Sequence, residues 1–563
     1  MYPSPQARTT DRTTLRRGRI VGAIFVVLLA VVLGRFFQLQ ILEHGQWEAA
    51  AASVQERTIE LPPKRGTILD RDGTVLAVDV RAAAIAVDGK NVTHPDQLAQ
   101  ILSDELGRDL QGIDDLVKVD RYFTWIDRRV DLETVRRIEQ RAEEADIYGL
   151  ILIDTWRRSY PQGALASNLL GFVGTDGEGL EGLELVYDEH LRGVPTVLRV
   201  VRGADGRTYS MEVTSEGAPG EDLRLTIDAE LQFLCEEEIQ TGVSRFQADG
   251  GMLIVLDPRT GEVLAMAQDA TYDLNRFWTS TADDRRNLAV THLFEPGSIF
   301  KVFAGLAALE TGAVTLDETF DGAAEIVVAG HTMHNADNEA YGTVTFSDVI
   351  KDSINTGMIQ VALRVGAEGL HACYHDLGFG TETGIELPGE IAGILRPAAV
   401  WSPVDVAAAS IGQSVAVTGI QLARAIAVVA SDGELLPPHV VQHPEPAAGD
   451  VVASPASCEA MREMMERVVE EGTGTWAAVP GFDVAGKTGT AQKAVPGLGY
   501  VEGKYTSLFA GMLTADDPAY VMVVVLDEVK TPYPSGGYTA GQIFQAAATR
   551  LLQHERVIPG IAW

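Results

Sequence analysis

One stretch near the N-terminus constrains this chain more than any other. Residues Ile20 to Gly34 carry no charge, and beyond Arg35 the apolar trend continues to Leu42. In hydrocarbon a backbone must satisfy its hydrogen bonds within the segment, so a single spanning stretch is a helix. Fifteen uncharged residues fall short of the ~20 that span a bilayer, but the long Arg35 side chain can reach the interface. We therefore predict a transmembrane anchor over residues 20–42.

The residues ahead of this stretch set its orientation. Five arginines lie within residues 1–19 against one acidic residue, Asp11. Positive flanks stay in the cytoplasm, so residues 1–19 are predicted to be a cytoplasmic tail. The chain is then a single-pass protein of the inner (cytoplasmic) membrane, with everything after the anchor in the periplasm or its extracytoplasmic equivalent. The alternative is a cleaved signal peptide, with the small residues Ala49 to Ser53 as its cleavage site.

Length and charge limit the remaining possibilities. A chain of 563 residues is too long for one ordinary core, so two or three folded units are expected. The formal charge of −34 argues against nucleic acid as a partner, because a phosphate-binding surface is basic. Three scattered cysteines give no disulfide framework, so stability must come from the core.

The body of the chain divides by pattern. Over residues 43–246, strand-like segments alternate with one amphipathic helix that Asp131 would cap. No glycine-rich loop here has the spacing of a nucleotide site, so no cofactor is expected. Residues 247–563 begin with a predicted hairpin over 250–268, continue with helices, and end with strands and a closing helix. This order predicts an α+β fold in which helices pack on an antiparallel sheet.

A candidate nucleophile lies in the second part. In the sequence Glu295-Pro-Gly-Ser-Ile-Phe-Lys301 the Pro-Gly turn precedes an apolar run, which predicts a helix that starts near Ser298. Lys301 follows three residues later, on the same face. A lysine whose pKa is lowered by burial and a cationic neighbour can take the serine proton. This four-residue pattern alone is also typical of an ordinary exposed helix start.

Two further motifs follow in order. Ser353-Ile-Asn355 interrupts two apolar-periodic runs and is predicted to form a turn between helices, while Lys487-Thr-Gly489 is predicted to lie on a strand. S-x-x-K, S-x-N and K-T-G in this order are the known signature of penicillin-binding proteins and class A β-lactamases.

With these motifs the chain resembles the class B penicillin-binding proteins, the membrane-anchored peptidoglycan D,D-transpeptidases, and the septal, FtsI-type members more than the elongation type. The likeness covers most of the sequence and includes RGTILDRDGTVLA at 65–77, the glycine-rich segment at 158–184 and LIVLDPRTGEVLAMA at 253–267. It departs at Ser414, where the family more often has glycine, and at Gly419, where it more often has proline.

The resemblance implies domains and partners. Residues 43–246 would be a pedestal of the dimerisation type, with Arg65 and Glu184 in motifs that hold it to the catalytic domain; the alternative is a simple surface ion pair. Residues 247–563 would be the transpeptidase domain. The partners would be stem peptides ending in D-Ala-D-Ala, β-lactams, a membrane glycosyltransferase and other division proteins.

The resemblance also implies roles around the nucleophile. Ser298 would attack the penultimate D-alanine carbonyl and Lys301 would receive its proton. Ser353 and Asn355 would complete a proton and hydrogen-bond relay, in which the Ser353 hydroxyl passes a proton to the leaving amine. The backbone N–H groups of Ser298 and Thr490 would form the oxyanion hole.

The third motif would recognise the substrate. Lys487 would lower the pKa of its lysine neighbour and attract the terminal carboxylate. The hydroxyls of Thr488 and Thr490 would bind that carboxylate, and Gly489 would leave room for a peptide along the strand edge.

Alternatives remain in other classes. His331 with His334, and His371 with Cys373 and His375, have spacings used by metal sites. They lie in an apparent loop and in an amphipathic helix without acidic partners, so no metal site is expected. A carboxypeptidase or β-lactamase-like hydrolase shares the acylation step, and a non-catalytic division scaffold or β-lactam sensor shares the fold. The anchor and long pedestal argue against a compact hydrolase, and the complete set of motif residues argues against an inactive scaffold.

Overall fold

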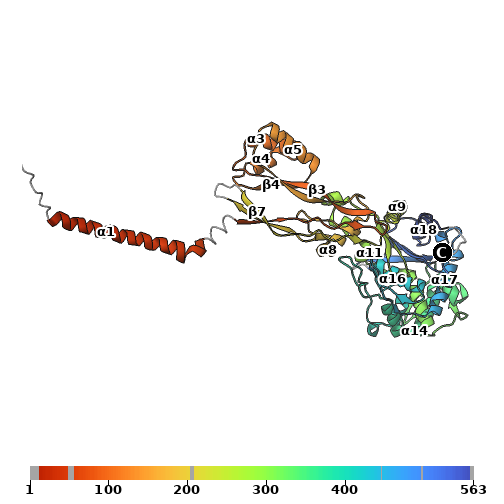
Figure 1. Ribbon diagram of the computed structural model, residues 1–563. Coiled ribbons are helices and arrows are strands. Elements are labelled where there is room, and N and C mark those ends of the chain that lie inside the picture. The colour runs from red at the N-terminus through yellow and green to blue at the C-terminus, as the bar shows by residue number, and fades with distance from the viewer. Residues whose placement is uncertain (1–11, 48–55, 203–207, 445–446, 496–498, 558–563) are drawn as a thin grey trace, which may run out of the picture. The chain divides into compact units, whose positions relative to one another are not determined.

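A computed structural model describes residues 12–47, 56–202, 208–444, 447–495 and 499–557 (Figure 1). These residues form two compact units, which the chain enters more than once. Unit 1 comprises Met1–Pro63, Ala84–Thr155 and Val194–Ala218, and unit 2 comprises Lys64–Ala83, Trp156–Gly193 and Pro219–Trp563. The predicted boundary at residue 246 stays a prediction.

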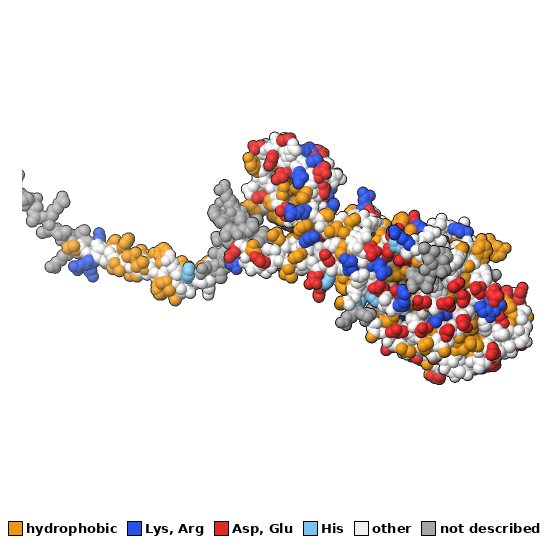
Figure 2. All heavy atoms as spheres, turned by 45° about the vertical axis from the view of Figure 1, so that its right-hand side comes forward, with side chains coloured by type: hydrophobic (Ala, Val, Ile, Leu, Met, Phe, Trp, Pro, Cys, Tyr) orange, Lys and Arg blue, Asp and Glu red, His pale blue; other side chains and the backbone are white. Residues whose placement is uncertain are grey.

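The N-terminal helix continues past the uncharged core of the stretch. Helix α1 spans Arg12–Phe37 and runs into a π-helical turn over Gln38–Leu42. Residues Leu15–Leu42 form the one described helix that is long and apolar enough to cross a membrane. Figure 2 shows hydrophobic side chains covering this helix, with basic side chains toward its N-terminal end. An apolar surface of this extent is typical of a helix that packs against lipid.

Unit 1 combines a three-stranded sheet and helices with parts of a second sheet. Strands β1 (Glu56–Leu61), β6 (Thr196–Arg202) and β7 (Thr208–Ser215) form an antiparallel sheet in the order β1-β6-β7. In the second sheet β4 (Thr124–Asp131) pairs with β3 (Val75–Val87), which also pairs with β5 (Leu150–Ser159). Of β3 and β5, residues 84–87 and 150–155 belong to unit 1. The helices are α3 (Pro95–Leu106), α4 (Leu110–Val117) and α5 (Leu132–Glu144). As predicted, Asp131 caps α5, because its carboxylate accepts the N–H of Thr134 across 2.9 Å.

Unit 2 is built on one antiparallel sheet. Its order is β10-β9-β19-β18-β17, from β9 (Gly250–Leu256), β10 (Val263–Gln268), β17 (Val484–Val495), β18 (Gly499–Leu513) and β19 (Tyr520–Asp527). The predicted first hairpin and the last strands therefore share one sheet. Nearly every β19 side chain is buried, which requires cover on both faces.

Helices cover both faces of this sheet (Figure 1). On one face α9 (Ala229–Phe246) and α18 (Ala540–His554) pack on residues such as Met522 and Val524. On the other face α16 (Gly419–Ala430) packs against β9 and β19. There Val521 and Val523 belong to a core that also includes residues of α12 (Phe300–Glu310), α14 (Asn355–Asp376) and α17 (Pro455–Glu470). Alternate strand residues thus enter opposite layers of the core. The predicted α+β fold is confirmed.

Short elements complete unit 2. They are β2 (Ile68–Leu69), β8 (Leu223–Arg224), α6 (Ser167–Leu170), α7 (Gly182–Val186), α8 (Asp188–Arg192), α10 (Ala282–Arg285), α11 (Leu288–Thr291), α13 (Phe346–Lys351) and α15 (Pro403–Ser410). Three two-stranded antiparallel sheets pair β11 (Thr319–Gly322) with β14 (Gly342–Thr345), β12 (Glu325–Val328) with β13 (His331–His334), and β15 (Glu434–Leu435) with β16 (Asp450–Val451).

A buried ion network joins distant segments of unit 2. Arg65 Nε lies 2.7 Å from Glu184 Oε2, and Arg158 Nε lies 2.6 Å from Glu184 Oε1. Arg65 also pairs with Asp188 across 2.7 Å. All four side chains are buried or nearly so, so the alternative of a surface pair is wrong. Because each ion depends on its partners once it is removed from water, loss of any one of them would leave an uncompensated buried charge.

Candidate active site

Ser298 lies on a tight turn that leads into α12. Residues Gly297–Ile299 form a 3₁₀ turn, and Lys301 lies in the first turn of the α-helix that follows. Two glycines let other backbones approach this turn closely. A Cβ at Gly489 would lie 2.8 Å from the Pro296 carbonyl oxygen, and one at Gly412 would overlap the Gly297 carbonyl. The turn is therefore held between strand β17 and the loop that follows α15.

Ser353 is the point where the three motifs meet. It lies between α13 and α14 with φ of +59°, a backbone conformation that non-glycine residues seldom adopt. Its Oγ accepts a hydrogen bond from Lys301 Nζ and another from Lys487 Nζ, each across 3.0 Å. Lys301 Nζ also donates to the Ser353 carbonyl oxygen. The structure thus brings Lys301, Ser353 and Lys487, one residue from each motif, together.

Burial shapes the charge of both lysines. Burial, and then the charge of Lys487, hold the pKa of Lys301 well below its usual value. Burial lowers the pKa of Lys487 to about 7. If both lysines were charged, two ammonium groups would lie beside the same Ser353 oxygen and repel each other. A neutral amine at Lys301 is the form that can accept a proton.

Asn355 is the first residue of α14, beside Ser353. Its Nδ2 donates to the carbonyl oxygen of His334 across 2.8 Å. This bond fixes the orientation of the amide and leaves Oδ1 as the acceptor that the site can use.

Lys487 projects from β17, which lies at the end of the strand order and is an edge strand. The neighbouring hydroxyls have partners on other segments. Thr488 Oγ1 lies 2.9 Å from Thr473 Oγ1, and Thr490 Oγ1 accepts the N–H of Gly536 across 3.0 Å. The edge and these two hydroxyls therefore lie beside the loops around residues 473 and 536. Gly489 serves the close contact with the Ser298 turn, a role that the sequence did not predict.

A carboxyl group near the nucleophile was not predicted from the sequence. Glu295 Oε1 accepts hydrogen bonds from the Ser414 N–H across 2.9 Å and from the Tyr500 hydroxyl across 3.1 Å. Burial raises the pKa of Glu295. Ser414 has φ of +62°, which explains why glycine suits this position in the family. The contact ties three segments that are far apart in sequence, so no local pattern could have indicated it.

The histidine pairs have ordinary surroundings. His331 and His334 belong to strand β13 rather than to the expected loop. The rings of His371 and His375 stack on α14, 6.2 Å apart between centroids, and His371 also contacts Trp401 edge to face. None of the four belongs to a group of three metal-ligand candidates within the described part of the chain.

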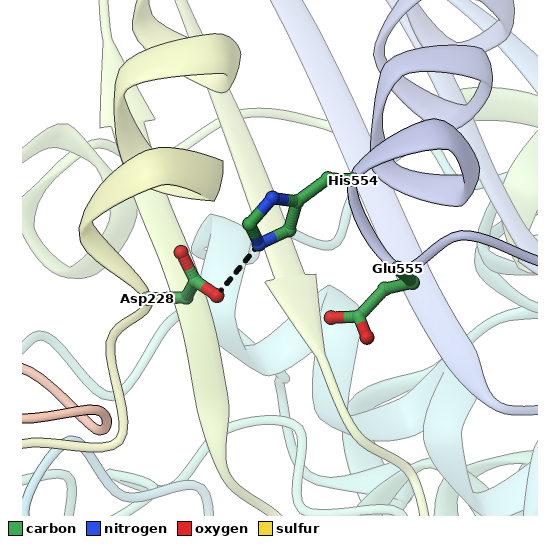
Figure 3. Close-up of side chains that lie close together, drawn as sticks. All are labelled: Asp228, His554 and Glu555. Atoms are coloured by element: carbon green, nitrogen blue, oxygen red, sulfur yellow. Dashed lines mark hydrogen bonds and ion pairs between the residues drawn. The ribbon is translucent and has the colours of Figure 1, made fainter.

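A group with metal-like spacing does occur elsewhere in unit 2. Ligand atoms of Asp228, His554 and Glu555 lie within 4.8 Å of one another (Figure 3). However, Asp228 caps α9 through the Leu231 N–H and bonds His554 Nε2 across 2.9 Å.

The group lines a cavity of about 360 Å³, together with Arg71, Arg259, Asp72 and Asp257. The charges of the two arginines and the two further carboxylates offset each other there. We interpret the group as a structural contact, in which His554 at the end of α18 holds that helix to Asp228 at the start of α9.

Comparisons with known proteins agree with this geometry. Residues 251–549 match the penicillin binding protein transpeptidase domain, and residues 60–225 match the penicillin-binding protein dimerisation domain. The chain is 32% identical to the probable peptidoglycan D,D-transpeptidase PenA of Neisseria gonorrhoeae, over 97% of this chain and 94% of that protein.

Two further matches cover nearly the same extent. The peptidoglycan D,D-transpeptidase FtsI of Escherichia coli is 29% identical, over 99% of this chain and 95% of that protein. The structure of penicillin binding protein 3 from Mycobacterium tuberculosis, complexed with aztreonam, matches with a TM-score of 0.70 and 29% identity, over 89% of this chain and 98% of that one.

Proposed function

The chain belongs to the class B penicillin-binding proteins, the peptidoglycan D,D-transpeptidases, and we propose that it crosslinks stem peptides at the division septum with Ser298 as nucleophile. The observation that carries the assignment of the site is the shared hydroxyl of Ser353, which accepts bonds from Lys301 and Lys487. The likeness to FtsI over almost the entire chain supports the septal role.

The proposed reaction begins with acylation of Ser298. Ser298 Oγ attacks the carbonyl carbon of the penultimate D-alanine, and its proton passes to the neutral amine of Lys301. The backbone N–H groups of Ser298 and Thr490 bind the oxyanion. When the tetrahedral intermediate collapses, the C–N bond breaks and the Ser353 hydroxyl passes a proton to the leaving amine of the terminal D-alanine.

The third motif binds the end of the donor peptide. An incoming carboxylate raises the pKa of Lys487 above its resting value of about 7, so substrate binding itself favours the charged lysine. Thr488 and Thr490 exchange their present partners, Thr473 and Gly536, for the carboxylate. The donor then lies along the β17 edge, where a peptide can add as a strand.

An amine from a second stem peptide completes the reaction. It attacks the acyl-enzyme carbonyl, loses a proton to the relay, and releases Ser298 as the new amide bond forms. β-Lactams acylate the same serine, and the ester persists because water replaces the acceptor amine poorly. No cofactor or metal takes part in this proposal.

The anchor places the enzyme at its substrate. We assign it to the inner membrane as a single-pass protein with residues 1–19 in the cytoplasm, residues 43–246 as pedestal and residues 247–563 as the transpeptidase domain outside. A membrane glycosyltransferase would supply nascent glycan, and other division proteins would be further partners. The apolar helix Leu15–Leu42 with its basic flank supports this topology.

Labelling with a fluorescent penicillin tests the site. The wild-type protein should retain a covalent label, and Ser298→Ala should lose it while its melting temperature stays within ~1 °C. Given nascent glycan from an active polymerase, the wild-type protein should form dimeric stem peptides. Rapid turnover of penicillin without dimers would instead favour a hydrolase.

Depletion in the host cell tests the septal role. Cells that lose septal crosslinking continue to lengthen and form filaments, whereas loss of an elongation enzyme makes rod-shaped cells round. Round cells would assign the chain to elongation and leave the chemistry of Ser298 intact.

A further inference from the structure

Helix α14 begins at the active site without a cap of its own. The first four N–H groups of any helix lack partners within it, and a side-chain oxygen at the N-cap commonly accepts one of them. The N-cap residue here is Ile354, whose apolar side chain makes no such bond. Ser353 and Asn355 lie on either side of it, so the missing cap concerns the residues that carry the second motif.

A distant asparagine supplies the cap. Asn335 Oδ1 accepts the backbone N–H of Thr356 across 3.1 Å and its hydroxyl across 3.3 Å. Asn335 Nδ2 donates to the carbonyl oxygens of Ala323 and Glu339, across 3.1 and 2.9 Å. The side chain is 3% exposed. Its two donor hydrogens and its oxygen are thus all used, which fixes the amide in a single orientation.

His334, the residue before Asn335, binds the side-chain amide of Asn355. The His334 carbonyl accepts the Asn355 amide across 2.8 Å, so two consecutive residues at the end of β13 hold two consecutive residues at the start of α14. The Asn335 N–H donates to the Ala324 carbonyl across 3.1 Å, which ties this end of β13 to the residue ahead of β12.

We propose that Asn335 is a positioning residue for transpeptidation, which caps α14 from outside and thereby sets Asn355 and Ser353 in their working geometry. This inference rests on the proposed function, because it assigns Asn335 to those two residues. Without the cap, the Thr356 N–H is buried and unpaired, and the first turn of α14 relaxes toward other acceptors. The Asn355 amide then loses its fixed distance to the donor peptide, and Ser353 loses its alignment with the two lysines.

The test compares acylation with stability. Asn335→Ala should slow acylation by a fluorescent penicillin roughly tenfold, the equivalent of one lost cap. Folding is checked by circular dichroism and thermal melting. The matched control is Ser454→Ala, which removes the cap of α17, where Ser454 accepts the Ser457 N–H. The control should lower the melting temperature to a similar degree and leave the acylation rate unchanged.

The conservative variant Asn335→Asp gives a second measurement, the pH dependence of the acylation rate, which a purely structural role would leave unchanged. Asn335→Asp keeps the acceptor for Thr356 but turns a charged oxygen toward the carbonyls of Ala323 and Glu339. Protonation of that buried carboxyl restores one donor. The acylation rate of this variant, as a ratio to wild type at the same pH, should therefore rise as pH falls. This measurement also decides the question if Asn335→Ala does not fold.

The possible results distinguish a failure of the role of Asn335 from a failure of the proposed function. Wild-type acylation rates in folded Asn335→Ala, equal slowing in Ser454→Ala, or a flat rate ratio in Asn335→Asp would each overturn the positioning role while labelling of Ser298 stands. Undiminished labelling of Ser298→Ala would instead overturn the proposed function, and the role of Asn335 with it.

Discussion

The side-chain nitrogens of Lys301 and Lys487 lie at the same distance, 3.0 Å, from one oxygen atom, the hydroxyl of Ser353. Both lysines are fully buried. Two ammonium charges at such a point repel each other, and burial penalises each of them. The arrangement therefore favours a resting site in which Lys301 is neutral, and it makes the protonation of one lysine depend on the other.

This dependence predicts a shift in the pH profile. Lys487→Met removes a positive neighbour, so the pKa of Lys301 rises and its basic form appears only at higher pH. The acidic limb of the acylation profile should move to higher pH, with a roughly tenfold slower rate at pH 7. The control Lys493→Met changes a lysine of the same strand that pairs with Asp527 and Glu528, and should keep the wild-type profile. An acidic limb that does not move in Lys487→Met would contradict the coupling.

The glycine of the third motif gives a steric prediction. In Gly489→Ala the new Cβ would lie 2.8 Å from the Pro296 carbonyl, so the Ser298 turn must move. We expect acylation to slow about tenfold, with a melting temperature a few degrees lower. Gly250→Ala, where the nearest atom would be Asp269 Oδ1 at 3.4 Å, should do neither. Equal acylation rates for the two variants would show that the close contact has no role in placing Ser298.

The contact between His554 on α18 and Asp228 predicts a pH-dependent stability. Burial opposes the charge of His554, but the hydrogen bond to Asp228 and nearby acidic groups outweigh it and raise its pKa. A raised pKa in the folded state contributes stability that is fully present below the unfolded value of about 6.5 and is lost as pH rises through the folded value. His554→Gln should therefore cost roughly 1 kcal/mol at pH 5.5 and less at pH 8.5 in urea melts. A penalty that is the same at both pH values would remove the ion pair from the explanation.

The anchor predicts a fractionation result. If Leu15–Leu42 spans the membrane, the protein stays full length and sediments with membranes, and protease added outside reaches residues 43 onward. A soluble mature form that starts near Ala50 would show instead that the segment is cleaved.

The sequence was sufficient for much of the fold because its signals are local. The strands, the Asp131 cap and the closing helix each depend on residues within one element, and the structure contains all of them. For the same reason the three motifs could be predicted to lie at a helix start, on a turn between helices and on a strand. Their convergence on Ser353 Oγ follows from tertiary packing, and the sequence indicated it only through a known combination of motifs.

Other parts of the site left no local signal. Glu295, Thr473 and Asn335 act through partners more than a dozen residues away. In the sequence Asn335 cannot be told from an ordinary loop asparagine. Its hydrogen bond to the start of α14 matters because that helix lacks a cap of its own. The burial of Arg65 with Glu184 was likewise invisible, since charged residues usually lie on the surface.

The hairpin formed by β12 and β13 extends from this cap into solvent, where Val327 is 64% exposed. Surface positions of this kind tolerate substitution, and selection can vary them without disturbing the core. A change there would reach Asn355 only through the strand end at His334 and Asn335. A substitution in this hairpin would therefore alter the rate of acylation while every residue of the three motifs keeps its identity.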